Sequence, residues 1–91
     1  MLFVIHAKDK PGSLELRKAT RDAHLEFLAS FTIPVGGPLL DADGQMCGSC
    51  IVLDVDDRAA AEAFIAGDPY GKAGLFENVE LHEFMKVSWP T

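Results

Sequence analysis

His24 is the side chain of this sequence best suited to moving protons, because an imidazole changes its charge near neutral pH. It stands in a run that begins after Ser13, in which leucine, alanine and phenylalanine recur at the spacing of a helix. On a helical wheel His24 falls near the middle of the apolar arc, where a buried imidazole needs a partner for each ring nitrogen. Two interpretations follow: a core histidine whose nitrogens are satisfied, or a general acid or base at the floor of a pocket.

Asp68 is the candidate partner of His24, because a histidine base needs a carboxylate to orient it. Asp68 and Pro69 follow Gly67, where a helix is expected to end, so capping of the next turn is the competing interpretation. In a βαββαβ fold the loop after the second helix lies beside the first helix, within reach of its inward face. We therefore predict His24 and Asp68 as a catalytic pair.

Three further residues are predicted to bind the substrate of this pair. Arg17 lies two helical turns before His24 and is expected to attract an anionic oxygen, and with Arg21 it makes a local basic edge. Ser49 and Tyr70 are expected to donate hydrogen bonds to the substrate. The competing interpretation of Ser49 is an ordinary strand residue, and that of Tyr70 is a pocket wall or a surface aromatic. The expected ligand is a small molecule that carries an anionic group.

Neither a metal nor a cofactor is predicted. The three histidines show no metal-ligand spacing. Cys47-Gly48-Ser49-Cys50 matches C-x-x-C, but it falls in a predicted strand, where residues three apart point to opposite faces, rather than at the start of a helix. No G-x-G-x-x-G follows the first strand, and there is no phosphate-binding loop motif.

The elements that must hold these residues follow one another in the order β-α-β-β-α-β. The expected strands cover 1–8, 33–40, 47–55 and 79–89, and the second of them has a bulge or close backbone approach at Gly36-Gly37-Pro38. The first expected helix runs from the N-cap Ser13 to Phe31. The second covers 58–66 and is capped by Asp56-Asp57. Two helices on one face of a four-stranded antiparallel sheet make a ferredoxin-like α+β fold, of the dimeric α+β barrel type. Its other sheet face has no cover, which predicts a homodimer.

Composition limits the class of protein. The chain has 91 residues, 48% of them hydrophobic, which predicts a single domain over 1–91. Eight Lys and Arg against 14 Asp and Glu give a net charge of −6, which argues against nucleic acid and anionic membranes as partners. No apolar run is long enough to span a bilayer, and the apolar N-terminus lacks the basic region of a signal peptide. With only two cysteines, a reducing cytoplasm is expected.

Taken together these residues resemble the YciI-like family (YCII-related domain) of small bacterial proteins. The resemblance covers nearly the whole chain and rests on Arg17 to Leu25, Gly37-Pro38, Gly48-Ser49, Asp68-Pro69-Tyr70 and Ala73-Gly74. It implies a ferredoxin-like dimer with a His–Asp dyad at His24 and Asp68. One branch of the family implies dehydrochlorinase chemistry on chlorinated hydroxyquinol-type aromatics. Glu83, where many members have proline, departs from the pattern and leaves the substrate open.

The sequence thus predicts a cofactor-independent enzyme that performs acid–base chemistry, of a lyase or dehydrochlorinase kind, on a small polar cyclic or aromatic metabolite. The alternative is a non-catalytic ligand-binding module, since Asp9 to Leu14 is similar to the opening D-x-P-G-x-L of ACT regulatory domains, which share the βαββαβ order. A third interpretation is an interaction domain that only dimerises.

Overall fold

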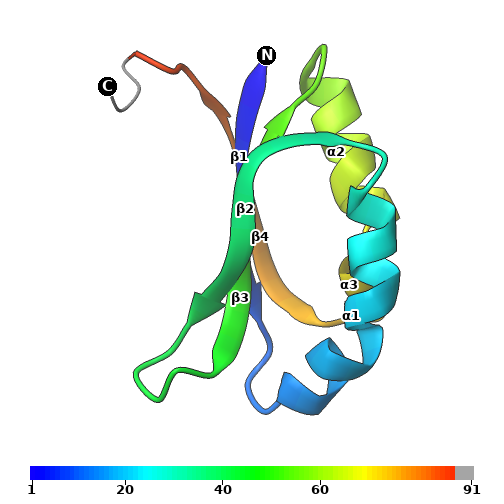
Figure 1. The fold of residues 1–91 in the computed structure, drawn as a ribbon, viewed down its shortest axis with the longest axis vertical. Helices are drawn as coiled ribbons and strands as arrows, with labels where there is room; N and C mark the ends of the chain where they lie inside the picture. The colour runs from blue at the N-terminus through cyan, green and yellow to red at the C-terminus, as the bar shows by residue number, and fades with distance from the viewer. Residues whose placement is uncertain (88–91) are drawn as a thin grey trace.

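The computed structural model describes residues 1–87, which form two layers: a four-stranded sheet and helices on one of its faces (Figure 1). The elements are β1 (Leu2–Asp9), α1 (Leu14–Leu28), β2 (Thr32–Leu40), β3 (Met46–Asp54), α2 (Arg58–Gly67), α3 (Pro69–Lys72) and β4 (Phe76–Phe84). The predicted ferredoxin-like α+β fold is confirmed, with the short α3 added after α2. Within residues 1–87 no helix is long and apolar enough to cross a membrane.

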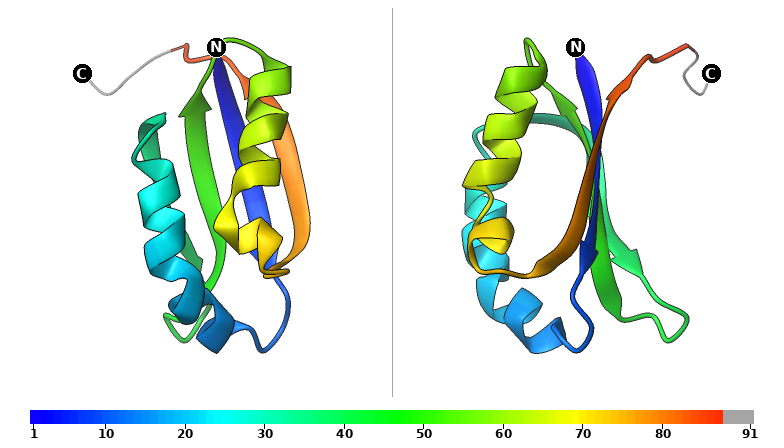
Figure 2. Two further views of the ribbon diagram at one scale, coloured as in Figure 1. Left: turned by 90° about the vertical axis from the view of Figure 1, so that its right-hand side faces the viewer. Right: turned by 180° about the vertical axis from the view of Figure 1, so that it is seen from behind.

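The strands lie in the order β2-β3-β1-β4, and every neighbouring pair is antiparallel. Each long helix therefore joins two strands that are not neighbours: α1 crosses over β3, and α2 crosses over β1. Figure 2 shows α1 and α2 side by side on the same face of the sheet. This arrangement brings the end of α2 next to α1.

The core lies between the two layers because alternate strand residues point towards the helices. Phe3 and Leu53 are fully buried there, together with Phe64 of α2. Each such side chain contributes roughly 1.5–3 kcal/mol by leaving water. The rings of Phe27 and Phe31 pack against Phe64 at centroid distances of 5.3 and 4.8 Å, which fixes α1 against α2.

The first helix is shorter than predicted. It ends at Leu28 after 15 residues and does not reach Phe31, whose N–H instead donates to the carbonyl of Leu28 in a turn. The hydroxyl of Ser30 donates to the carbonyl of Phe27, which takes up a group that a continuing helix would use. Ser13 occupies the N-cap position, but its side chain makes no capping hydrogen bond.

The last strand is displaced from its predicted range of 79–89. It begins at Phe76, which pairs with Asp9 at the end of β1, and it ends at Phe84, opposite Leu2. Its length is set by the strand it pairs with, which the sequence of β4 alone does not show. Trp89, the predicted end, lies outside the described residues.

The bulge predicted at Gly36-Gly37-Pro38 is wrong. Pairing with β3 is regular from Val35 to Leu39, and the register shifts fall on either side of that stretch. The close approach in this sheet occurs at Gly48, where an added Cβ would lie 2.5 Å from the carbonyl oxygen of Ala7. Glycine is therefore required beside Ser49.

Candidate functional site

A cleft of about 220 Å³ opens between α1 and the strands β2 and β3. It is lined by Arg17, Arg21, His24, Leu25 and Leu28 of α1, Gly36, Gly37 and Pro38 of β2, Met46, Ser49 and Ile51 of β3, and Tyr70 of α3. The structure thus brings four predicted site residues, Arg17, His24, Ser49 and Tyr70, to one cleft. Asp68 lies behind it, in contact with His24.

His24 and Asp68 are hydrogen-bonded and buried. Nδ1 of His24 lies 2.8 Å from Oδ1 of Asp68, and the two residues are 6% and 4% exposed. Because a carboxylate accepts, Nδ1 carries the hydrogen, and Nε2 of the neutral ring keeps its lone pair. Among residues 1–87, every fully buried side-chain nitrogen or oxygen has a hydrogen-bond partner. Nε2 of His24 has no such partner among these residues, so this atom is not fully buried and reaches the open space of the cleft.

The local sequence around Gly67 explains why Asp68 reaches α1. A Cβ added at Gly67 would lie 3.2 Å from the ring of Phe27, so glycine lets the end of α2 approach that helix. Pro69 then starts α3, and Oδ1 of Asp68 also accepts from the backbone N–H of Tyr70 at 3.0 Å. The carboxylate therefore makes the predicted cap and holds His24 as well.

Arg17 is paired with Asp9, the last residue of β1, which lies just beyond the strand predicted over 1–8. Its Nε and Nη2 donate to the two carboxylate oxygens of Asp9 at 2.7 and 2.9 Å, and Nη2 also donates to Oγ of Ser49 at 2.8 Å. Burial acts to lower the pKa of Arg17, but the hydrogen bond and charge of Asp9, with Tyr70, outweigh it and raise that pKa. The available signal was the alternation Phe3, Ile5, Ala7, Asp9, whose members all face the core.

Tyr70 forms the wall between Arg17 and His24. Its ring stacks on the imidazole with centroids 3.9 Å apart, and the guanidinium carbon of Arg17 lies 4.6 Å from the ring centroid. Two helical turns separate Arg17 from His24 by ~10 Å along the axis, so the ring fits between them. With 1% of its surface exposed, Tyr70 is a pocket wall and not a surface aromatic.

The burial of Tyr70 leads to a prediction about its ionisation. Burial raises the pKa of its phenol, while the charges of Arg17 and Arg21 act to lower it. Because the chain contains one tyrosine, tyrosinate absorbance reports on this residue alone. We expect its titration midpoint to lie above the ordinary value of about 10, and to return to that value in denaturant. A midpoint at or below about 10 in the folded protein would contradict the burial argument.

The same shift makes stability depend on pH. The folded state holds the phenol proton of Tyr70 more tightly than the unfolded chain does. The contribution of this proton to the free energy of unfolding is therefore fully present below a pH of about 10, and it is lost as the pH rises through the folded pKa. A Tyr70→Phe variant is expected to lack that alkaline loss in its urea-unfolding curves.

The cysteine motif lies in β3, as predicted, and both Cys47 and Cys50 are free thiols. Cys50 pairs across the sheet with His6 on the face away from the helices, whereas Cys47 lies at the strand's start. Among residues 1–87 no group of three or more His, Cys, Asp or Glu side chains is placed to hold a metal ion.

Comparison with known proteins points to one family. The YCII-related domain matches residues 1–85. Protein YciI of Escherichia coli O6:H1 is 35% identical over 96% of this chain and 99% of its own length. The solved 5-chloro-2-hydroxyhydroquinone dehydrochlorinase of Burkholderia phenoliruptrix, in complex with 2,5-dihydroxybenzoquinone, is 37% identical with a TM-score of 0.89, over 93% of this chain and 94% of that one. A NIPSNAP domain protein of Burkholderia xenovorans, 19% identical with a TM-score of 0.59 over 100% of this chain and 99% of that one, shares the fold alone.

Proposed function

The chain belongs to the family of YCII-related domains, and on this premise we propose that it is a small cytoplasmic enzyme of acid–base chemistry. His24 exchanges a proton with a small polar cyclic or aromatic substrate, and Asp68 orients the imidazole. The observation that carries the proposal is the buried 2.8 Å hydrogen bond between Asp68 and a histidine that lines the cleft.

The dyad works as a base through Nε2. This nitrogen accepts a proton from the substrate, and the carboxylate of Asp68 stabilises the imidazolium that forms. The stacked ring of Tyr70 keeps the imidazole in one orientation, which spares the cost of ordering it at each turnover. Ser49 and Tyr70 also line the cleft, and in this proposal their hydroxyl groups form hydrogen bonds with the substrate.

The reaction class we propose is elimination. The solved relative is a dehydrochlorinase of a chlorinated hydroxyhydroquinone. Dehydrochlorination is a reaction that needs one base and one leaving group. A hydroxyl proton of the substrate first moves to the ring carbon that bears chlorine, which gives the keto tautomer with a tetrahedral C–H(Cl) carbon. His24 then removes a second hydroxyl proton, the freed electron pair forms a carbonyl and a new ring double bond, and chloride leaves with the electrons of the broken carbon–chlorine bond. The products are hydrogen chloride and a quinone-type ring, and no oxidant or reductant is consumed.

The test uses 5-chloro-2-hydroxyhydroquinone as the probe, with chloride release as the readout. We expect release that is proportional to the concentration of the protein. Without it, dehydrochlorination is excluded for this substrate. A thermal-shift screen with amino acids and phenolic acids then separates the enzyme from a binding module, because stabilisation by amino acids that survives His24→Asn supports the module.

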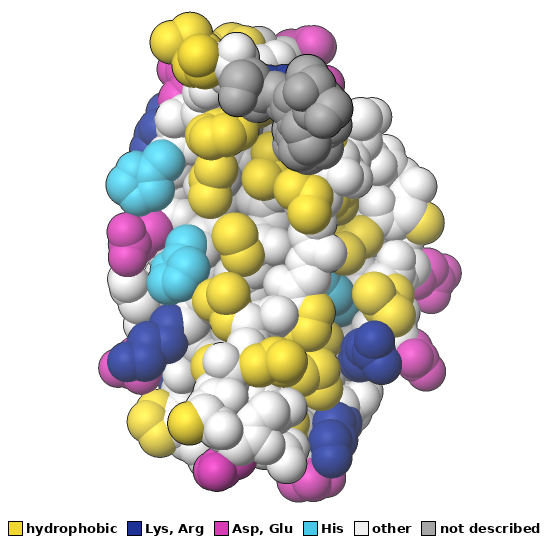
Figure 3. Space-filling model, turned by 60° about the vertical axis from the view of Figure 1, so that its left-hand side comes forward, with side chains coloured by type: hydrophobic (Ala, Val, Ile, Leu, Met, Phe, Trp, Pro, Cys, Tyr) yellow, Lys and Arg dark blue, Asp and Glu magenta, His cyan; other side chains and the backbone are white. Residues whose placement is uncertain are grey.

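We also propose that the protein is a homodimer that packs through its sheet. The face away from the helices carries apolar side chains from all four strands, and Figure 3 shows hydrophobic groups gathered there. A groove of about 620 Å³ on this face is lined by Met1, Leu2, Pro34, Val35, Val52, Asp54, Phe84 and Lys86. An apolar sheet face of this kind is typical of a contact between subunits.

A single charge on this face is expected to break the dimer. Val35 is 54% exposed and stands opposite Val52, so Val35→Glu places a carboxylate where two apolar surfaces meet, at little cost to the monomer. Sedimentation at micromolar concentration should give a dimer for the wild type and a monomer for the variant. Leu16→Glu, a change of the same kind on α1, should stay dimeric; a monomeric wild type refutes the proposal.

A further inference from the structure

The cleft contains two arginines, and among residues 1–87 only Arg17 has an ion-pair partner. Arg17 gives Nε and Nη2 to Asp9 and Ser49, and the charge of Asp9 neutralises it. Arg21, one helical turn further along the same face, lines the cleft with an exposed side chain. Among residues 1–87 no carboxylate lies within ion-pairing distance of Arg21.

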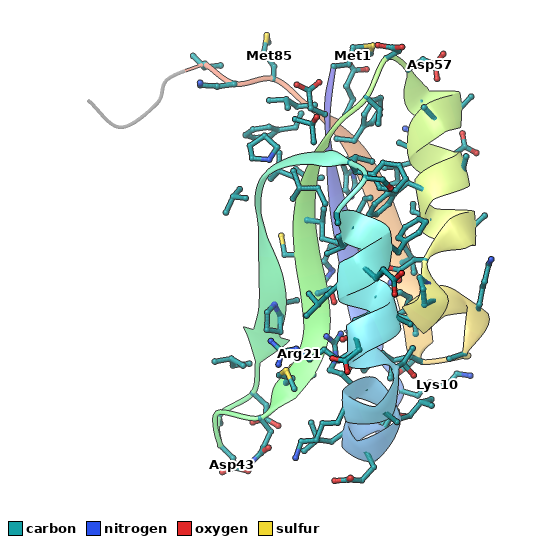
Figure 4. The ribbon with its side chains drawn as sticks, turned by 45° about the vertical axis from the view of Figure 1, so that its right-hand side comes forward. Met1, Lys10, Arg21, Asp43, Asp57 and Met85 are labelled. Atoms are coloured by element: carbon teal, nitrogen blue, oxygen red, sulfur yellow. The ribbon has the colours of Figure 1, made fainter. Side chains whose placement is uncertain are left out.

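The free guanidinium points its charge towards the cleft. Figure 4 shows Arg21 on the side of α1 that is turned to β2 and β3. Its charge acts on the phenol of the buried Tyr70, where it opposes the rise in pKa that burial causes, so its electrostatic field reaches the cleft wall. Within the part of the chain that the structure describes, no acidic side chain lines the cleft, although the chain as a whole carries a net charge of −6. The cleft is thus a local positive site in an acidic protein.

The other walls limit the size and polarity of a ligand. The volume of about 220 Å³ lies below the roughly 300–1,000 Å³ of sites for drug-sized ligands. It exceeds the ~150 Å³ of an engineered cavity that binds benzene. Much of the remaining lining is apolar: Leu25 and Leu28 of α1, Pro38 of β2, and Met46 and Ile51 of β3. One substituted six-membered ring fits these limits.

Gly36 keeps this space open. It pairs with Ile51 on the face towards the helices, so a side chain at this position would project from β2 into the cleft. An added Cβ would already lie 3.2 Å from Ile33 and 3.5 Å from Ile51. The backbone of β2 therefore forms a flat wall against which a ring can lie.

We propose that Arg21, and not Arg17, binds the anionic group of a single-ring aromatic acid in this cleft. This inference rests on the proposed function, for which it names the substrate class and the residue that recognises it. The carboxylate or phenolate of the ligand pairs with the guanidinium of Arg21. The ring then lies against Gly36, next to Nε2 of His24, which follows Arg21 by one helical turn.

Calorimetric titration with two unreactive probes of the same shape, benzoate and benzamide, tests this inference. The wild type is expected to bind benzoate about tenfold or more tightly than neutral benzamide, as is typical for a charge-assisted hydrogen bond. Arg21→Gln should reduce this ratio to about one and leave benzamide binding unchanged. Arg21→Lys should keep part of the preference, because it retains the charge but loses the planar fork.

Lys18→Gln is the matched control, since it removes the same charge from an exposed position of α1 that does not line the cleft. It should keep the preference for benzoate. A preference that persists in Arg21→Gln overturns the role of Arg21, and a wild type that binds neither probe at millimolar concentration overturns the ligand class. Neither outcome depends on turnover, so failure of the catalytic proposal shows separately, as absence of chloride release.

Discussion

Replacing Asp9 with alanine is expected to lower the free energy of unfolding by about 3–5 kcal/mol, the typical cost of removing one partner from a buried ion pair. The variant leaves the guanidinium of Arg17, 2% exposed, without a counter-charge and with two of its donors unpaired. A domain of this size is stable by only about 5–15 kcal/mol, so much of its margin is lost. Urea unfolding followed by circular dichroism measures the change.

Two comparisons show whether the burial of the pair is the cause. The double variant Asp9→Leu with Arg17→Met removes both charges and is expected to recover most of the loss, because an apolar pair of similar volume often replaces a buried ion pair without cost. Asp57→Ala removes an exposed carboxylate that caps α2 through the N–H of Ala60 and should cost about 1 kcal/mol. If Asp9→Ala costs no more than Asp57→Ala, the pair does not hold this end of the cleft together.

The Asp9–Arg17 pair is a contact that the sequence alone does not predict, unlike the fold. The fold follows from local patterns: alternation in strands, helical periodicity in 14–28, and turn residues between them. Asp9 stands at the border between the alternating strand and the Lys10-Pro11-Gly12 segment that follows, and it falls just outside the strand predicted over 1–8. Its partner lies in another element, so only the packed structure identifies the pair.

The sequence alone also does not predict where β4 begins and ends, or which arginine of the cleft keeps an unpaired charge. The limits of β4 follow from those of β1, with which it pairs from Asp9 to Leu2. The helical wheel placed Arg17 and Arg21 on the same basic edge, but a wheel carries no information on which of them a distant carboxylate neutralises. The contact of His24 with Asp68 was predictable because the topology alone brings the end of α2 beside α1.

Removing the imidazole of His24 is expected to have the largest effect on activity. If Nε2 is the base, His24→Asn should lower chloride release from 5-chloro-2-hydroxyhydroquinone by about 10²–10⁴-fold, the usual contribution of a positioned acid or base. Asp68→Asn keeps an oxygen to cap Tyr70 but loses the charge that stabilises the imidazolium, so it should lose activity as well. Steady-state rates across a pH series measure both effects.

His82→Asn is the matched control, because His82 is exposed on β4 and, among the described residues, its side chain bonds only to Glu80. It should leave the rate unchanged. A cooperative melt of His24→Asn separates a catalytic role from a structural one, and Asp68→Asn gives a second test if His24→Asn does not fold. Full activity in either folded variant refutes the dyad, since a general base whose removal leaves the rate unchanged does not take part in proton transfer.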